Sequence, residues 1–356
     1  MYFNLASECY FVRGNESSVI YNLLTGEAMH LDQAETAVMQ RIHEGKECEQ
    51  NGFVAELAGG GWGFFSENRY FIDKLRPYTN YMLLRPDLNP PELNVVFLQL
   101  TDKCGSSHEF CRKMFCTPCR TGTGDAHELS LDHCREIIRH LSESGAKNII
   151  LTGGDLTSYE MLEAVVGHVI SNGIRCSILV NSEGDFTKPL PHTVPIMAYI
   201  CNADKADELI LAMSGQKNVT MICPNTLGAE IRNKIKQFNF SISSINVHNP
   251  AITAQNLKPC HMDDFFNKKD HNACLNGRMF IDAQGNLVPC FQDPDTPIGN
   301  VMKDDFPTLY RKLITNYWKR KECRPKCAAC EWFYACPVCM YMNPETVCSV
   351  HATSSL

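Results

Sequence analysis

The sequence has no apolar run approaching the roughly 18 residues that a membrane-spanning helix needs. Its N-terminus, MYFNLASECYFVRG, also lacks a basic segment followed by an apolar one, so no secretory signal is predicted. A long basic block is missing too, and the formal net charge is −7 at pH 7, which gives nucleic acid little to bind. These absences predict a cytoplasmic protein that binds neither membrane nor nucleic acid.

Cysteine, in contrast, is abundant, with 19 residues in a chain of 356. Thiols stay reduced in the cytosol, so we interpret these residues as metal ligands rather than as disulfides. Nine of them lie between residues 260 and 348, and four lie between residues 104 and 119. Close pairs such as Cys327-x2-Cys330 place two sulfur atoms on one turn, within reach of a shared metal centre. The pattern predicts iron–sulfur or other soft-metal sites.

A chain of this length should form more than one domain. Residues 1–80 predict a small strand-and-helix module with the outline of a winged helix, and the proline-rich residues 81–93 predict a linker. The predicted elements of the module are strands at 10–14 and 17–23, a helix from Asp32 to about Ile42, a helix near 50–57 and a glycine-rich hairpin at 59–65.

Residues 94–250 alternate between apolar strands and amphipathic helices. The near-continuous apolar run NVVFLQL at 94–100 is typical of a strand that is buried on both faces. Further strands are predicted at 147–154, 175–181, 197–202, 218–224 and 241–247. Six strands with crossover helices predict an α/β fold, either a parallel sheet or an incomplete barrel. The crossover at 183–195 is rich in proline, and we expect no regular helix there.

Chemistry in such a fold is expected at the carboxyl ends of the strands, where the loops gather. The first strand leads into TDKCGSSHEFCRKMFCTPC, and the second leads into TGGD, where Gly153 and Gly154 let the backbone approach a ligand or another loop closely. Asn181, at the end of the third strand, is a further candidate for cofactor contact. The first loop carries four cysteines, which are Cys104, Cys111, Cys116 and Cys119.

These loops, together with the C-terminal cysteine array, resemble radical S-adenosylmethionine enzymes with a SPASM domain, and in particular maturases of ribosomally made peptides. The resemblance covers about residues 94–350. It implies a compact partial (β/α)6 barrel, with a winged-helix-like module before it and a SPASM domain at 251–356. It also implies a [4Fe-4S] cluster that binds S-adenosylmethionine and cleaves it to a 5′-deoxyadenosyl radical. Asp155 matches the acidic residue of the family motif that approaches the methionine amino group.

The first cysteine loop departs from the usual CxxxCxxC spacing, because its gaps are six, four and two residues. Cys104 matches the first ligand of the family, since it follows the strand directly. We favour Cys116 and Cys119 as the other two ligands because they keep the final gap. The set of Cys104, Cys111 and Cys116 stays open as the alternative, since it places Phe115 before its last cysteine, where the family often has an aromatic residue.

The C-terminal array reproduces the opening of a SPASM domain, in which a glycine turns a hairpin between two cysteines, here Cys274-x10-Gly285-x4-Cys290. The resemblance implies two auxiliary [4Fe-4S] clusters. The first would be held by Cys260, Cys274, Cys290 and Cys339, and the second by Cys327, Cys330, Cys336 and Cys348. Cys323 is then surplus. A zinc site fits one CxxC pair equally well, but this many thiols without paired histidines favour iron and sulfur.

The resemblance implies a reaction on a precursor peptide whose leader binds residues 1–80, with a flavodoxin or ferredoxin as electron donor. Hydrogen abstraction from the peptide would be followed by formation of a cross-link or a related bond. Lys and Arg are sparse in residues 1–75, which argues against a DNA-binding role for the module. A rival hypothesis keeps the barrel without cofactor cleavage, so that the chain acts as a peptide-binding scaffold or an electron-transfer partner.

Overall fold

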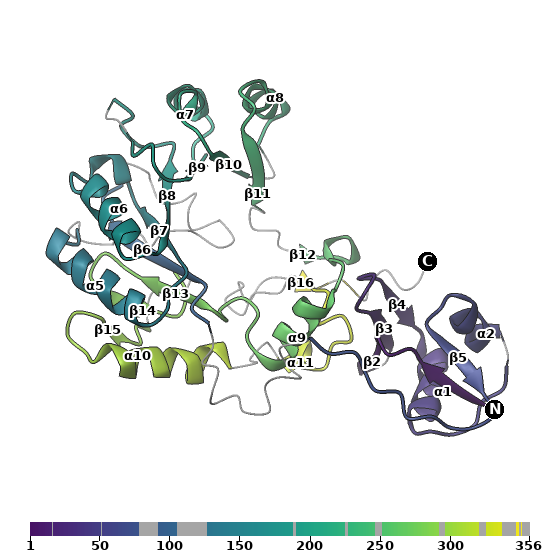
Figure 1. The fold of residues 1–356 in the computed structure, drawn as a ribbon. Coiled ribbons are helices and arrows are strands. Elements are labelled where there is room, and N and C mark those ends of the chain that lie inside the picture. Colours follow the sequence, from purple (N-terminus) through teal and green to yellow (C-terminus); the bar gives the residue numbers. More distant parts are fainter. Residues whose placement is uncertain are drawn as a thin grey trace. The chain divides into compact units, whose positions relative to one another are not determined.

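The structure, a computed structural model, is divided by its contacts into two compact units. Unit 1 comprises Met1–Pro90, Ala251–Cys274 and Lys319–Leu356, and unit 2 comprises Pro91–Pro250 and Leu275–Trp318. Figure 1 labels the elements of both units. The residues that the structure describes are 1–15, 17–50, 52–77, 92–104, 127–187, 190–224, 227–245, 251–291, 296–319, 325–336, 347–348 and 350.

Unit 2 is built on one sheet with the strand order β11-β10-β9-β8-β7-β6-β13-β14-β15. The strands from β6 to β11 pair in parallel, and β13 pairs in parallel with β6. All six predicted strands therefore form, and the prediction of an α/β fold is confirmed. Their bounds are β6 Val95–Thr101, β7 Asn148–Gly153, β8 Arg175–Asn181, β9 Ile196–Tyr199, β10 Val219–Pro224, β11 Ser241–Ile245, β13 Arg278–Ile281, β14 Asn286–Val288 and β15 Gly299–Asn300.

Helices connect the parallel strands, and α5 and α6 lie side by side against the sheet (Figure 1). Ser130 caps α5 by accepting a hydrogen bond from the His133 N–H at 3.2 Å, and the predicted apolar stripe of the helix is buried. The described part of the crossover between β8 and β9 contains no helix, as its prolines predict. The helices of unit 2 are α5 Leu131–Glu143, α6 Leu162–Ser171, α7 Ala206–Met213, α8 Ala229–Gln237 and α10 Phe306–Leu313, with short turns η1 Leu156–Ser158 and η3 Ile314–Trp318.

The N-terminal part of unit 1 contains an antiparallel sheet of β2, β3 and β4, together with a separate pair of β1 and β5. Asp32 caps α1 as predicted, and Glu35 completes a capping box. The predicted hairpin at 59–65 is wrong, because β5 pairs with β1 instead. The elements are β1 Tyr2–Leu5, β2 Cys9–Arg13, β3 Ser18–Asn22, β4 Ala28–Leu31, α1 Gln33–His43, α2 Gly52–Gly59 and β5 Gly63–Ser66.

A close approach explains this pairing of β5. A Cβ atom at Gly63 would stand 2.6 Å from the ring of Phe3 on β1, so only glycine lets the two strands come together. The remaining elements of unit 1 are β12 Ala251–Ile252, η2 Ala254–Asn256, α9 Met262–Asp270, α11 Pro325–Ala328 and β16 Val347–Cys348. Across the described ranges of both units, no helix combines the length and the apolar character that crossing a membrane requires.

Strand β3 is the central strand of its sheet, and both of its faces are buried. Ile20 packs with the apolar residues of α1 and α2, whereas Val19, Tyr21 and Leu23 point to the other face and pack with Phe265 of α9. Because both faces are buried, residues 19–21 (VIY) are all apolar instead of alternating between apolar and polar. The N-terminal sheet therefore lies between its own helices and the C-terminal segment of unit 1.

Two buried thiols in the core of unit 2 should make the protein less stable at alkaline pH. Burial raises the pKa of Cys134 to about 11 and that of Cys176 to about 12, against 9.0 for an exposed thiol. Their contribution to stability is complete below pH 9 and is lost as the pH rises through these values, because the unfolded chain ionises first. Each thiol should lower the free energy of unfolding by about 1.4 kcal/mol per pH unit in this window.

Cys176→Ala should make the alkaline decline in the free energy of unfolding shallower, and Ser171→Ala, at an exposed site, should keep the full slope. Denaturant titrations between pH 8 and pH 12 measure both variants. An unchanged slope in Cys176→Ala would show that this thiol ionises equally well in the folded and the unfolded chain.

Candidate active site and cluster-binding cysteines

The first cysteine loop leaves the sheet at the carboxyl end of β6, where Cys104 is half-buried. Residues 105–126 lie outside the described residues, and with them the predicted ligands Cys111, Cys116 and Cys119. The two ends of this loop are bonded to each other. The carboxylate of Asp102 accepts hydrogen bonds from the backbone N–H of His127 at 2.5 Å and, through its other oxygen, contacts the His127 ring at 3.2 Å. Lys103 pairs with Glu128 at 3.0 Å. The loop is thus closed at its base.

The Gly153–Asp155 loop packs directly on the start of the cysteine loop. The Gly154 N–H donates to the Thr101 carbonyl oxygen at 2.9 Å, and the Asp155 N–H donates to that of Lys103 at 2.6 Å. A Cβ atom at Gly154 would overlap the Lys103 carbonyl and stand 2.9 Å from the Cβ of Cys104. Glycine is therefore required here, as its place after a strand predicted.

Asp155 is held in one orientation by its own turn. Its Oδ1 accepts hydrogen bonds from the N–H of Thr157 at 2.9 Å and from the hydroxyl of Thr157 at 2.5 Å. Within the described ranges, all hydrogen bonds to this carboxylate use Oδ1, which leaves Oδ2 for a ligand. An amino group is a suitable partner, because it would form a charge-assisted hydrogen bond with that oxygen. The site therefore fits the amino group that the family resemblance implies for Asp155.

Asn181 ties the third strand to this loop by a hydrogen bond to Gly154. Its Nδ2 donates to the Gly154 carbonyl oxygen, and its Oδ1 accepts the N–H of Glu183 at 2.9 Å. The side chain is 8% exposed. Asn181 thus fixes the backbone of the glycine loop from the opposite side to Cys104. It would influence a bound cofactor either by holding this loop in place or by contacting the cofactor next to the loop.

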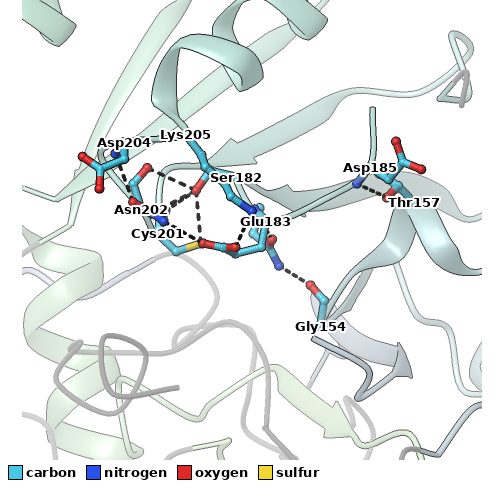
Figure 2. Close-up of polar contacts among 10 residues, drawn as sticks. Gly154, Thr157, Ser182, Glu183, Asp185, Cys201, Asn202, Asp204 and Lys205 are labelled. Atoms are coloured by element: carbon cyan, nitrogen blue, oxygen red, sulfur yellow. Dashed lines mark hydrogen bonds and ion pairs between the residues drawn. The ribbon is translucent and has the colours of Figure 1, made fainter. Parts of the chain in front are cut away.

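A polar network that the sequence did not predict joins the carboxyl ends of β8 and β9 (Figure 2). Ser182 Oγ accepts hydrogen bonds from the N–H groups of Cys201 at 3.2 Å and Asn202 at 2.9 Å. Glu183 pairs with Lys205 at 2.8 Å. Burial alone would raise the pKa of Glu183, but hydrogen bonds from Lys205 and Asn202 and the Lys205 charge lower it overall. Glu183 is therefore an anion at neutral pH, and its only sequence signal is its position just after a strand.

The C-terminal cysteines of unit 1 lie near one another. The Cys330 N–H donates to the Cys327 carbonyl oxygen at 3.2 Å. Burial, with smaller contributions from the charges of Glu331, Cys348 and Cys327, raises the pKa of Cys330 to about 11, although a backbone hydrogen bond from Trp332 lowers it in part. Cys336 is buried and packs with Val350, two residues beyond Cys348. Cys327 and Cys348 are thus close enough to Cys330 to act on its pKa, and Cys336 packs beside Val350, whereas the assignment of these four cysteines to one cluster stays a prediction.

Cys260 belongs to the same part of the chain. It is fully buried. A negative charge on Cys260 would raise the pKa of Tyr21, as would one on Cys330. It would also raise the pKa of Lys268, as would a negative charge on Cys336. Burial raises the pKa of Cys260 itself to about 12. A metal centre here must displace these protons, because the thiolate is the form that binds metal.

The other predicted ligands are placed as follows. Cys274 is half-buried at the end of a segment of unit 1, and its N–H donates to Asn272 Oδ1 at 3.1 Å. Cys290 is buried in unit 2, just after the hairpin of β13 and β14. Gly285 makes the turn of that hairpin with a φ of 77°, as the motif predicted. Cys339 and Cys323 lie outside the described residues.

Among the residues that the structure describes, no three His, Cys, Asp or Glu side chains are grouped as ligands of one metal ion. In an iron–sulfur cluster each thiolate binds its own iron atom, and the cysteine sets assigned to such clusters stay predictions.

Comparisons with known proteins identify part of the chain. Residues 274–331 match the family model of SPASM, an iron–sulfur cluster-binding domain. Among solved structures, Streptococcus suis SuiB bound to the precursor peptide SuiA matches with 13% identity, 94% coverage of both chains and a TM-score of 0.48. Native anSMEcpe with bound AdoMet matches with 13% identity, 68% coverage of this chain, 88% of that chain and a TM-score of 0.44.

Curated protein sequences include none that matches the chain. The SPASM match begins at Cys274 and includes Cys290, Cys327 and Cys330, so it covers the first part of the cysteine array from which the domain was predicted, whereas Cys336, Cys339 and Cys348 lie beyond it. Residues 274–331 therefore match a SPASM iron–sulfur cluster-binding domain, which confirms the predicted domain in this part of the chain.

Proposed function

We propose that the chain is a radical S-adenosylmethionine enzyme that modifies a ribosomally synthesised precursor peptide. One observation carries this proposal. The glycine loop after β7 packs on the first residues of the cysteine loop after β6, with Gly154 against Lys103 and Cys104. A cluster on Cys104 and a ligand of Asp155 would thus be neighbours, which is the arrangement that cofactor cleavage needs.

Each cofactor has candidate residues in the chain. Cys104 with Cys116 and Cys119 would hold the first [4Fe-4S] cluster, and Cys111 is the alternative ligand. Asp155 Oδ2 would receive the amino group of S-adenosylmethionine, and Asn181 keeps the Gly154 carbonyl in place beside it. When bound, the cluster and S-adenosylmethionine supply a radical that abstracts hydrogen from the peptide.

The auxiliary clusters would be held in the SPASM region by two sets of thiols. The first set is Cys260, Cys274, Cys290 and Cys339, and the second is Cys327, Cys330, Cys336 and Cys348. An oxidising bond formation on the peptide releases an electron, and an auxiliary cluster is a suitable acceptor. A flavodoxin or ferredoxin would supply the reducing electron to the first cluster, in the reducing cytosol that the many thiols require.

The substrate is proposed from the N-terminal part of unit 1. This part contains a short antiparallel sheet together with α1 and α2, and the family resemblance implies that it is a winged, peptide-binding module. A leader peptide would add a strand to a sheet edge, so that backbone hydrogen bonds provide affinity. Cross-linking within the core part of the same peptide would follow at the carboxyl ends of the barrel strands.

Isotope transfer tests the proposal. A candidate precursor peptide deuterated at its side chains and α-carbons should transfer deuterium into 5′-deoxyadenosine when incubated with reduced, reconstituted protein and S-adenosylmethionine. Mass spectrometry of the nucleoside measures the transfer. Tight binding of the peptide without any 5′-deoxyadenosine would instead support the scaffold function, in which the barrel does not cleave its cofactor.

A further inference from the structure

A buried carboxylate joins the N-terminal sheet to the auxiliary cysteines. Glu331, which directly follows Cys330, is 2% exposed. One of its carboxylate oxygens accepts a hydrogen bond from the Ser17 hydroxyl, and the other lies against Gly14, where a Cβ atom would overlap it. Gly14 and Ser17 form the turn between β2 and β3, since the Gly14 N–H donates to the Ser17 carbonyl oxygen at 2.8 Å. The turn therefore holds the side chain of Glu331.

The same sheet holds the residues that follow. The hydroxyl of Tyr21 on β3 is buried and donates to the backbone carbonyl oxygen of Glu331 at 2.6 Å. The ring of His30 on β4 stacks on Trp332, with centroids 5.8 Å apart and planes within 9°. Tyr21 also meets Tyr334 edge to face at 5.9 Å. The turn between β2 and β3, together with β3 and β4, thus contributes to the position of residues 331–334.

Helix α9 also holds this segment. The Lys268 ammonium donates hydrogen bonds to the carbonyl oxygens of Tyr334 at 2.8 Å and Cys336 at 2.7 Å. Burial lowers the pKa of Lys268. The segment between Cys330 and Cys336 is thus bonded both to the N-terminal sheet and to α9.

We propose that the N-terminal sheet is a structural part of the auxiliary-cluster site, with Glu331 as the positioning residue that fixes Cys330. The proposal deepens the proposed function, but it rests only on the iron–sulfur domain and not on the radical reaction. Hydrogen-bond partners behind a metal ligand fix the orientation of that ligand, and their loss lowers metal affinity about 10- to 100-fold. Here those partners come from residues more than 300 positions away, since Ser17 and Glu331 are 314 residues apart.

Gly14→Ala tests the proposal from the far end of the contact. Its methyl group would push the flexible end of the Glu331 side chain away from the turn, without touching any cysteine. Full-length reconstituted protein, without S-adenosylmethionine or peptide, is exposed to an iron chelator under anaerobic conditions. We expect about four iron atoms per chain to leave about 10- to 100-fold faster from this variant than from the original protein.

Matched variants separate positioning from general destabilisation. Gly52→Ala, in the same module but with no atom within 4 Å of the added Cβ, should release iron at the original rate. Ser17→Ala, which removes the donor without adding bulk, should also accelerate release, and it decides the question if Gly14→Ala does not fold. Original release rates in both Gly14→Ala and Ser17→Ala would overturn the proposal.

Glu331→Gln adds a readout that a purely structural role would not change. Glutamine keeps the size and an acceptor oxygen for Ser17, so iron release should stay near the original rate. Loss of a negative charge beside Cys330 should raise the reduction potential of the auxiliary cluster, measured by a redox titration followed by electron paramagnetic resonance. Neither measurement depends on the formation of 5′-deoxyadenosine. A failed radical reaction would therefore leave this inference standing, and a failure of this inference would leave the proposed radical reaction standing.

Discussion

Gly154→Ala is expected to lower the rate of 5′-deoxyadenosine formation by about a hundredfold or more, because a misplacement of about 1 Å in a reactive site has an effect of this size. The added methyl group would overlap the carbonyl oxygen of Lys103. This is a backbone atom, so it cannot rotate away as the end of a side chain could. The glycine loop or the start of the cysteine loop must then move, and Asp155 and Cys104 would lose their relative positions. Quantifying the nucleoside under single-turnover conditions measures the effect.

Gly167→Ala is the matched control for this prediction. It places the same methyl group in α6, where no atom lies within 4 Å of the added Cβ. Alanine also favours a helix over glycine, so the control should keep both its fold and its rate. A Gly154→Ala variant with the original rate would show that the contact between the two loops is not needed for cofactor cleavage.

The second large effect concerns the ligands of the first cluster. Cys104→Ala, Cys116→Ala and Cys119→Ala should each abolish 5′-deoxyadenosine formation and lower the iron content by about four atoms per chain, because a cube cannot be held by two thiolates. Cys111→Ala should keep both the activity and the iron. Iron analysis and nucleoside assays on the four variants decide between the ligand sets.

The reverse outcome is equally informative for this loop. If Cys111→Ala abolishes activity and Cys119→Ala does not, the ligands are Cys104, Cys111 and Cys116. The auxiliary clusters serve as an internal control, since about eight iron atoms should remain in every variant that loses only the first cluster.

Local pattern was enough to predict much of the fold. The apolar run before Thr101 predicted a buried strand, and the i, i+3, i+4, i+7 stripe of α5 predicted a helix with one buried face. Both patterns lie within a short window of sequence. The same is true of Asp32, whose capping of α1 is a local hydrogen bond. Strand ends after apolar runs likewise predicted Cys104, Gly154 and Asn181 as neighbours.

Contacts between distant segments could not be predicted in this way. The glycine-rich run before β5 was predicted to form a hairpin, but its partner is β1, at the other end of the module. The sequence pattern predicted no role for Glu331, which is buried under a turn made by Gly14 and Ser17. The Glu183–Lys205 pair depends on two loops that meet only in the folded sheet.

The most direct test of the central claim uses anaerobically reconstituted, reduced protein with S-adenosylmethionine, assayed for iron and for 5′-deoxyadenosine. We predict about twelve iron atoms per chain, for three [4Fe-4S] clusters, together with formation of the nucleoside. About eight iron atoms and no 5′-deoxyadenosine, even with a candidate peptide present, would contradict the proposed enzyme and leave a protein with SPASM clusters alone.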